Sequence, residues 1–169
     1  GTEEKFNLLK HLDRLLLNSA KKIMLKSNIN EVKTFVPSFS TNDRTRSFLK
    51  VQDGCDYHCT FCTIPKARGS SRSQTIQQTI QVAKQLGQAG TKEIVLTGVN
   101  IGDFGSDTNE SFYDLIFGLD KVKCIERFRI SSIEPNLLSN DIIEFCAKSE
   151  KFMPHFHIPL QSGSDKILR

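Results

Sequence analysis

From residue 47 onward, apolar runs of strand length alternate with amphipathic runs of helix length, and this alternation most constrains the fold. Strands are expected at residues 47–52, 93–99, 125–133 and 153–160, and helices at 75–88, 112–119, 140–148 and from 163. Four strand–helix repeats predict parallel strands joined by right-handed crossovers. We therefore expect an α/β protein with a parallel sheet of about four βα units.

The segment before this alternation has a different character. Residues 3–17 carry leucines and Phe6 at steps of three and four, which predicts an amphipathic helix. Residues 18–46 are rich in Ser, Thr and Asn, and indicate a linker with a short extended piece at 32–36.

Composition places the chain among ordinary globular proteins. Of 169 residues, 38% are hydrophobic and 25% charged, and the net charge is +4, which permits a polyanionic partner without requiring one. We expect no membrane span and no signal peptide, because no run of about 18 apolar residues occurs. Five cysteines are an odd number, and three of them fall within eight residues, unlike a secreted disulfide framework. A cytoplasmic protein is the expectation.

Cys55, Cys59 and Cys62 form the strongest chemical signal, with C-x3-C-x2-C spacing directly after a short apolar strand and the turn Asp53-Gly54. A structural zinc site needs four ligands. An iron–sulfur cubane can be held by three thiolates with one iron left open to a substrate. Zinc with His58 as fourth ligand is the alternative, although His58 directly precedes Cys59 and would strain a tetrahedral site.

The string CDYHCTFCTIPKARGSSRS, residues 55–73, resembles the radical S-adenosylmethionine (SAM) methylthiotransferases. Phe61 matches the aromatic position of that motif, and IP-x2-RG is followed by an Arg/Ser pair. The resemblance is strongest to the enzymes that act on N6-threonylcarbamoyladenosine 37 (t6A37) of tRNA, and it covers the whole chain. It implies a partial (β/α) barrel with a 4Fe–4S cluster on Cys55, Cys59 and Cys62, whose fourth iron binds SAM.

The resemblance also implies the reaction. A 5′-deoxyadenosyl radical derived from SAM would activate C2 of the modified adenine, and a methylthio group would be inserted there. Residues 1–45 would be the tail of a preceding methylthiotransferase domain plus a linker, and 46–169 the first part of the radical SAM core. A second 4Fe–4S cluster would lie in that preceding domain, so this piece alone would be inactive. A flavodoxin or ferredoxin would supply electrons, and the enzyme would be a monomer.

Two alternatives remain open from the residues. A methylthiotransferase of the same class could act on isopentenyladenosine in tRNA or on a ribosomal protein. A zinc-binding module that docks RNA through a basic loop is the rival from another class.

Further site residues are expected where strands end. Gly98 and Asn100 follow the strand at 93–99, where the resemblance implies a contact with SAM. Arg129 and Ser131 share a strand face with Arg127, opposite Phe128 and Ile130, and Glu134 ends that strand. The expected partners of these arginines are neighbouring carboxylates, a SAM carboxylate or a tRNA phosphate.

The remaining candidates rest on two strings. His157 and Gln161 lie in HIPLQSGS, which by resemblance borders the SAM and substrate site, and His155 is expected to face the barrel interior with His157. Lys66, Arg68 and Arg72 follow the cysteines, either as a solvated basic loop or as groups that orient a SAM carboxylate or an RNA backbone. Cys124 and Cys146 are assigned to packing.

Overall fold

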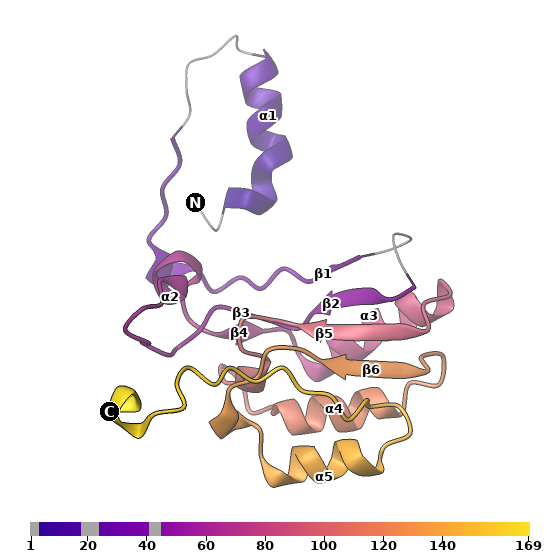
Figure 1. Ribbon diagram of the computed structural model, residues 1–169. Coiled ribbons are helices and arrows are strands. Elements are labelled where there is room, and N and C mark those ends of the chain that lie inside the picture. Colours follow the sequence, from indigo (N-terminus) through magenta and orange to yellow (C-terminus); the bar gives the residue numbers. More distant parts are fainter. Residues whose placement is uncertain (1–3, 18–23, 41–44) are drawn as a thin grey trace.

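The computed structural model describes residues 4–17, 24–40 and 45–169. Its centre is a four-stranded sheet in the order β1-β2-β5-β6, and helices cover one face of it (Figure 1). The strands are β1 (Ser38–Phe39), β2 (Ser47–Lys50), β5 (Glu93–Thr97) and β6 (Arg127–Ile130), and the pair β3 (Gln52–Asp53) and β4 (Arg72–Ser73) forms a small second sheet.

The helices that follow the strands of the parallel sheet lie close to their predicted positions. They are α3 (Ile76–Gln88), α4 (Phe112–Asp120) and α5 (Asn140–Lys148), with α1 (Leu8–Leu17), α2 (Ile64–Arg68) and α6 (Asp165–Leu168) as the others. Short 3-10 turns are η1 (Glu4–Asn7), η2 (Ile29–Glu31), η3 (Ile101–Asp103) and η4 (Pro135–Leu137). Thr75 and Gln78 form a capping box at the start of α3, and Ser111 and Ser139 cap α4 and α5 through their side chains.

Strand register sorts the side chains of the sheet into two faces. β2, β5 and β6 are parallel, and Leu49, Leu96 and Ile130 lie side by side. This face is fully buried beneath the helices, where Phe128 and Phe152 stack with ring centroids 5.0 Å apart. The opposite face carries Lys50, Thr97 and Arg129, because successive strand residues point to opposite sides. The predicted apolar and charged faces of β6 are thus confirmed.

The expected extended piece at 32–36 is not a strand. The strand forms later, at Ser38–Phe39, and pairs antiparallel with β2. Pro37 and the polar residues around it keep the preceding segment irregular.

The expected fourth strand at 153–160 was also wrong. The segment lies parallel beside β6 but makes only isolated bridges, Phe128 to Phe152 and Ser132 to His157. The bridged residues Phe128 and Ser132 are four positions apart in the sequence, whereas their partners Phe152 and His157 are five positions apart. The second segment therefore has one extra residue, which interrupts the ladder as in a β-bulge. Pro154, which lies between them, also lacks an N–H to donate.

The amphipathic helix predicted at 3–17 is present as η1 and α1. α1 extends away from the sheet (Figure 1), whereas the Phe6 ring of η1 lies 5.5 Å from Lys50 Nζ of β2. Several apolar side chains of α1 are exposed, with Leu9 at 78% and Leu16 at 81%. Residues 1–3, 18–23 and 41–44, which belong to the predicted helix start and linker, lie outside the described residues. Within the described part of the chain, no helix is long and apolar enough to cross a membrane.

Candidate metal and ligand site

The three clustered cysteines lie in the loop between β3 and α2. Gly54 opens the loop with φ of 79°, a backbone conformation that a side chain disfavours. The Cys55 N–H donates to the Gly69 carbonyl at 3.0 Å, and the Cys62 N–H donates to the Cys59 carbonyl at 3.0 Å. Cys55 and Cys62 are half-buried and Cys59 is exposed. All three thiols are therefore held by one loop whose two ends are tied together.

This loop fits an iron–sulfur cluster in donor type and number, and in the space beside it. Among residues 4–17, 24–40 and 45–169, no three His, Cys, Asp or Glu side chains are grouped closely enough to hold a metal ion. The three thiols are thus not gathered around a single-ion site, although Cys59 and Cys62 both lie near enough to affect the pKa of Cys55. Burial raises the pKa of the Cys55 thiol, so a metal has to displace its proton. Three soft thiolates in one loop match the ligand set of a cubane with one iron left open.

A cavity of about 480 Å³ adjoins Cys55. One wall comes from η2 in the N-terminal segment, and the other comes from the cysteine loop and α2. The lining residues are Ile29, Asn30, Cys55, Asp56, His58, Pro65, Lys66, Gly69 and Ser70. The cavity brings the predicted ligand Cys55 and the predicted anion contact Lys66 together in one place.

Gln52 ties the cysteine loop to the end of β5, a role not predicted from the sequence. Its side chain is fully buried. The Nε2 group donates to the Gly54 carbonyl at 2.7 Å and to Ser71 Oγ at 2.9 Å. The Oε1 atom accepts the N–H groups of Val99 at 2.9 Å and Asn100 at 3.0 Å. A glutamine inside the apolar run FLKVQ was the available signal, because a buried amide must find such partners.

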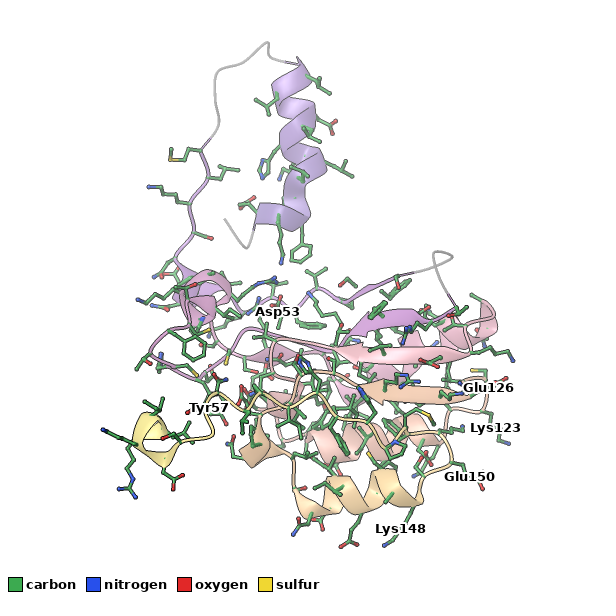
Figure 2. The ribbon with its side chains drawn as sticks, viewed as in Figure 1. Asp53, Tyr57, Lys123, Glu126, Lys148 and Glu150 are labelled. Carbon is green, nitrogen blue, oxygen red and sulfur yellow. The ribbon has the colours of Figure 1, made fainter. Side chains whose placement is uncertain are left out.

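Asp53 is the second buried polar residue at the base of this loop (Figure 2). Its carboxylate meets Arg68 at 3.2 Å, Arg72 at 3.3 Å and Lys50 at 3.4 Å. Burial opposes ionisation of Asp53, but the three cations outweigh burial and hold the pKa of the carboxyl below its ordinary value. Asp53 therefore remains a carboxylate that joins β2, α2 and β4.

Arg72 is not part of a solvated basic loop, and this corrects the prediction. It is 4% exposed and lies on β4, paired with β3. Besides Asp53, its guanidinium donates to the carbonyls of Thr34, Arg68 and Ser70 at 2.9–3.0 Å. Arg72 is thus a structural residue, whereas Lys66 and Arg68 remain exposed.

The segment that follows β5 is held by hydrogen bonds of the Asn100 side chain. The Asn100 side chain donates to Asp103 Oδ2 at 3.0 Å and accepts the Glu134 N–H at 3.2 Å, so it joins the ends of β5 and β6. Burial, aided by Asp56, raises the pKa of Asp103 despite the bond from Asn100. A Cβ at Gly98 would approach Gln52 Oε1 and Ile101 Cγ2 to 2.8 Å, so Gly98 permits this close packing.

The cysteine loop is also joined to the residues after β6. The Tyr57 hydroxyl accepts a hydrogen bond from the Asn136 amide at 2.6 Å (Figure 2 labels Tyr57). Neither residue was singled out in the sequence, and a lone tyrosine between two cysteines carries no recognisable signal.

The remaining predicted site residues lie farther apart. Arg129 Nε donates to Glu93 Oε1 at 2.7 Å, and Arg46 and Arg127 approach the same carboxylate at 3.7 Å, so a neighbouring carboxylate is the partner of this arginine. Ser131 is half-buried beyond Arg129, and its N–H donates to Leu96 O. His157 is exposed, with its Nδ1 atom 3.2 Å from Ser132 Oγ, and His155 is also exposed. Phe61 and Gln161 are exposed, and Gln161 has φ of 57°.

The two remaining cysteines pack as predicted. Cys146 lies on the buried face of α5. Burial raises its pKa to about 11, so it stays a neutral thiol. Cys124 lies against Gly87, where a Cβ would overlap its sulfur. Both are outside the cysteine loop.

Comparison with known proteins identifies the class. Residues 49–169 match the model of the radical SAM superfamily, and the chain belongs to that family. The fold agrees: a radical SAM methyltransferase, TsrM from Kitasatospora setae, superposes with a TM-score of 0.59 at 12% identity, over 72% of this chain and 23% of that one.

Two proteins with a higher sequence identity to this chain than TsrM are named as tRNA-modifying enzymes. The chain is 42% identical over its full length to the threonylcarbamoyladenosine tRNA methylthiotransferase MtaB of Bacillus subtilis, and it spans 38% of that protein. It is 40% identical to the tRNA-2-methylthio-N(6)-dimethylallyladenosine synthase of Pelagibacter ubique, over 75% of this chain and 29% of that protein.

Proposed function

We propose that the protein containing this chain inserts a methylthio group into N6-threonylcarbamoyladenosine 37 of tRNA. The observation that carries this proposal is the loop of three cysteines beside an open cavity, in a chain that resembles such a methylthiotransferase from end to end. The dimethylallyladenosine enzymes resemble it over a smaller share of the chain and are the second candidate.

Each part of the site has a task in this proposal. Cys55, Cys59 and Cys62 hold a 4Fe–4S cluster, and Gly54 and Gln52 fix the loop that carries them. When bound, that cluster supplies the electron that cleaves SAM and starts radical chemistry at the substrate. Gly98, Asn100 and Glu134 border the place for SAM at the strand ends, whereas Arg129, Ser131, His157, Phe61 and Gln161 remain candidates on the flanks. Lys66 meets the RNA backbone.

The wider assignments belong to the same proposal. Residues 1–45 connect a preceding methylthiotransferase domain, which bears the second 4Fe–4S cluster, to the radical SAM core that begins at residue 46. A flavodoxin or ferredoxin donates electrons, and the enzyme works as a monomer in the cytoplasm. The 169 residues alone do not turn over tRNA.

The test is product formation by the full-length protein, reconstituted without oxygen. We expect mass spectrometry of digested tRNA to reveal the methylthio form of threonylcarbamoyladenosine. Cys62→Ser should reduce that product to background, because one cluster ligand is lost. Cys124→Ser, a matched change outside the loop, should retain it.

Analysis of the bound metal distinguishes the iron–sulfur enzyme from the zinc-binding module. Iron and sulfide bound to the wild-type protein and lost from Cys62→Ser agree with the proposal. Zinc in place of iron would favour the RNA-docking zinc module. Product from dimethylallyladenosine tRNA alone would move the assignment to the second candidate.

A further inference from the structure

A second pocket, of about 230 Å³, lies at the carboxyl ends of β2 and β5, beside Gln52 and Asp53. It is lined by Ser38, Lys50, Gln52, Asp53, Arg68, Thr97, Gly98 and Val99. Ser38, Lys50 and Thr97 are neighbours in register on β1, β2 and β5, and they share the sheet face that the helices leave free. The pocket therefore opens on the inner side of the curved sheet, at the strand ends that adjoin the cysteine loop.

Positive charge is in excess around this pocket. Lys50, Arg68 and Arg72 all point at the single carboxylate of Asp53, which leaves two of the three positive charges uncompensated by it. Arg72 also has three backbone carbonyls to donate to, whereas Lys50 and Arg68 line the pocket. The Lys50 side chain is 16% exposed and that of Arg68 45%, and a cation that is partly withdrawn from water gains from an approaching anion.

Lys50 is held so that its ammonium group borders the pocket. Its side chain is 16% exposed, and its Nζ lies 5.0 Å from the Phe35 ring centroid and 5.5 Å from that of Phe6. These rings and Asp53 restrict the flexible side chain, which reduces the entropy lost when a ligand binds. Burial lowers the pKa of Lys50, and an incoming anion would restore its preference for the charged form.

We propose that this pocket binds the carboxylate of the substrate's threonylcarbamoyl group, with Lys50 and Arg68 as its cationic partners. This inference rests on the proposed function and names the part of the substrate that the site recognises. In a threonylcarbamoyl group the amino nitrogen of threonine is in the carbamoyl linkage, so the carboxylate is free and ionised. A dimethylallyl group has no charge, so Lys50 and Arg68 would have no anion beyond the Asp53 carboxylate that they already share. The pocket thus selects between the two adenosine modifications.

The methionine carboxylate of SAM has the same chemistry, and the experiment has to distinguish the two sources. The full-length protein is titrated with anticodon stem-loop RNAs that carry threonylcarbamoyladenosine, its carboxyl methyl ester or dimethylallyladenosine, and the Kd is measured by fluorescence anisotropy. The SAM affinity of each variant is measured separately by equilibrium dialysis.

We expect the wild-type protein to bind the acid about ten-fold more tightly than the ester, in line with one charge-assisted hydrogen bond to a half-buried cation. Lys50→Met should reduce this preference to less than about two-fold and leave SAM affinity unchanged. Lys50→Arg should keep most of the preference. Lys84→Met, a matched change at an exposed position of α3, should keep all of it.

Equal affinity of the wild-type protein for acid and ester overturns the inference, and this comparison needs no variant to fold. A Lys50→Met protein that retains the preference but loses SAM affinity also overturns it, because the bound carboxylate is then that of SAM. Formation of methylthiolated product is scored independently. If product forms but the protein does not prefer the acid to the ester, only the inference about the pocket is overturned. If no RNA gives product, the proposed function is overturned.

Discussion

At the scale of single residues, Gln52 shows how a buried amide positions a loop. Its two ends satisfy polar groups of two different segments, the cysteine loop and the turn after β5. Gln52 itself is fully buried, so the groups that it bonds lose a partner if the amide is removed. Gln52 is therefore a positioning residue for the ligands rather than a ligand itself.

Gln52→Met keeps the length of the side chain and removes its hydrogen bonds. We expect unfolding in urea to show a loss of about 2–4 kcal/mol, because several buried donors and acceptors are left unpaired. Gln85→Met, on the exposed side of α3, is the matched control and should change stability by less than about 0.5 kcal/mol. An equally small effect at Gln52 would mean that water replaces the amide.

Single residues also mark the limit of what the sequence could predict. The cysteine spacing alone predicted the loop that we propose binds a cluster, because the three cysteines lie within eight residues. Arg72 was expected either in a solvated basic loop or as a contact for an anionic ligand, since its partner Asp53 is brought close only by the pairing of β3 with β4. Partners separated by many residues leave no local pattern.

At the scale of elements, the cysteine loop depends on how it leaves β3. Gly54 lies at positive φ, and an added Cβ would collide with the Ser70 carbonyl. The loop can thus pass close beneath the segment that returns into β4, and the Cys55 N–H can reach the Gly69 carbonyl.

Gly54→Ala should cost at least about 2 kcal/mol of unfolding free energy, since it adds a disfavoured backbone conformation to a steric clash. We also expect a lower iron content after anaerobic reconstitution, because the loop must shift. Gly163→Ala provides the comparison, with no neighbour within 4 Å and no positive φ. Similar stability and iron content in the two variants would show that the Gly54 turn tolerates a side chain.

Elements were predicted well where their signals are local. The helices at 76–88, 112–120 and 140–148 combine a capping residue with a buried stripe, and both signals lie within the segment itself. The strand expected at 153–160 failed because pairing also depends on the partner. One surplus residue opposite β6 is invisible in the segment alone.

At the scale of the whole molecule, the sheet has two unlike sides. One side packs against the helices and forms a continuous apolar core with them. The other side bears the charged residues and the pocket near Lys50. α1 belongs to neither, because it extends away from the sheet and exposes Leu8, Leu9, Leu12 and Leu16 (Figure 1).

Leu9→Lys together with Leu16→Lys should leave the unfolding free energy of this 169-residue chain within about 0.5 kcal/mol, because neither side chain is buried. Light scattering should reveal less self-association, since exposed apolar area is removed. Leu115→Lys, at a fully buried position of α4, should prevent folding. A large loss of stability from the α1 double change would mean that this helix packs on the sheet.

The Gln52 bond network also has a consequence for the timing of assembly. Its acceptor contacts with Val99 and Asn100 join residues 47 and 48 positions apart, whereas the three cysteines follow Gln52 almost at once. During translation, all three cysteines of the cysteine loop are therefore synthesised well before Val99 and Asn100, which anchor the loop through Gln52. The nascent chain thus passes through an interval in which the thiols are present but not yet held in position.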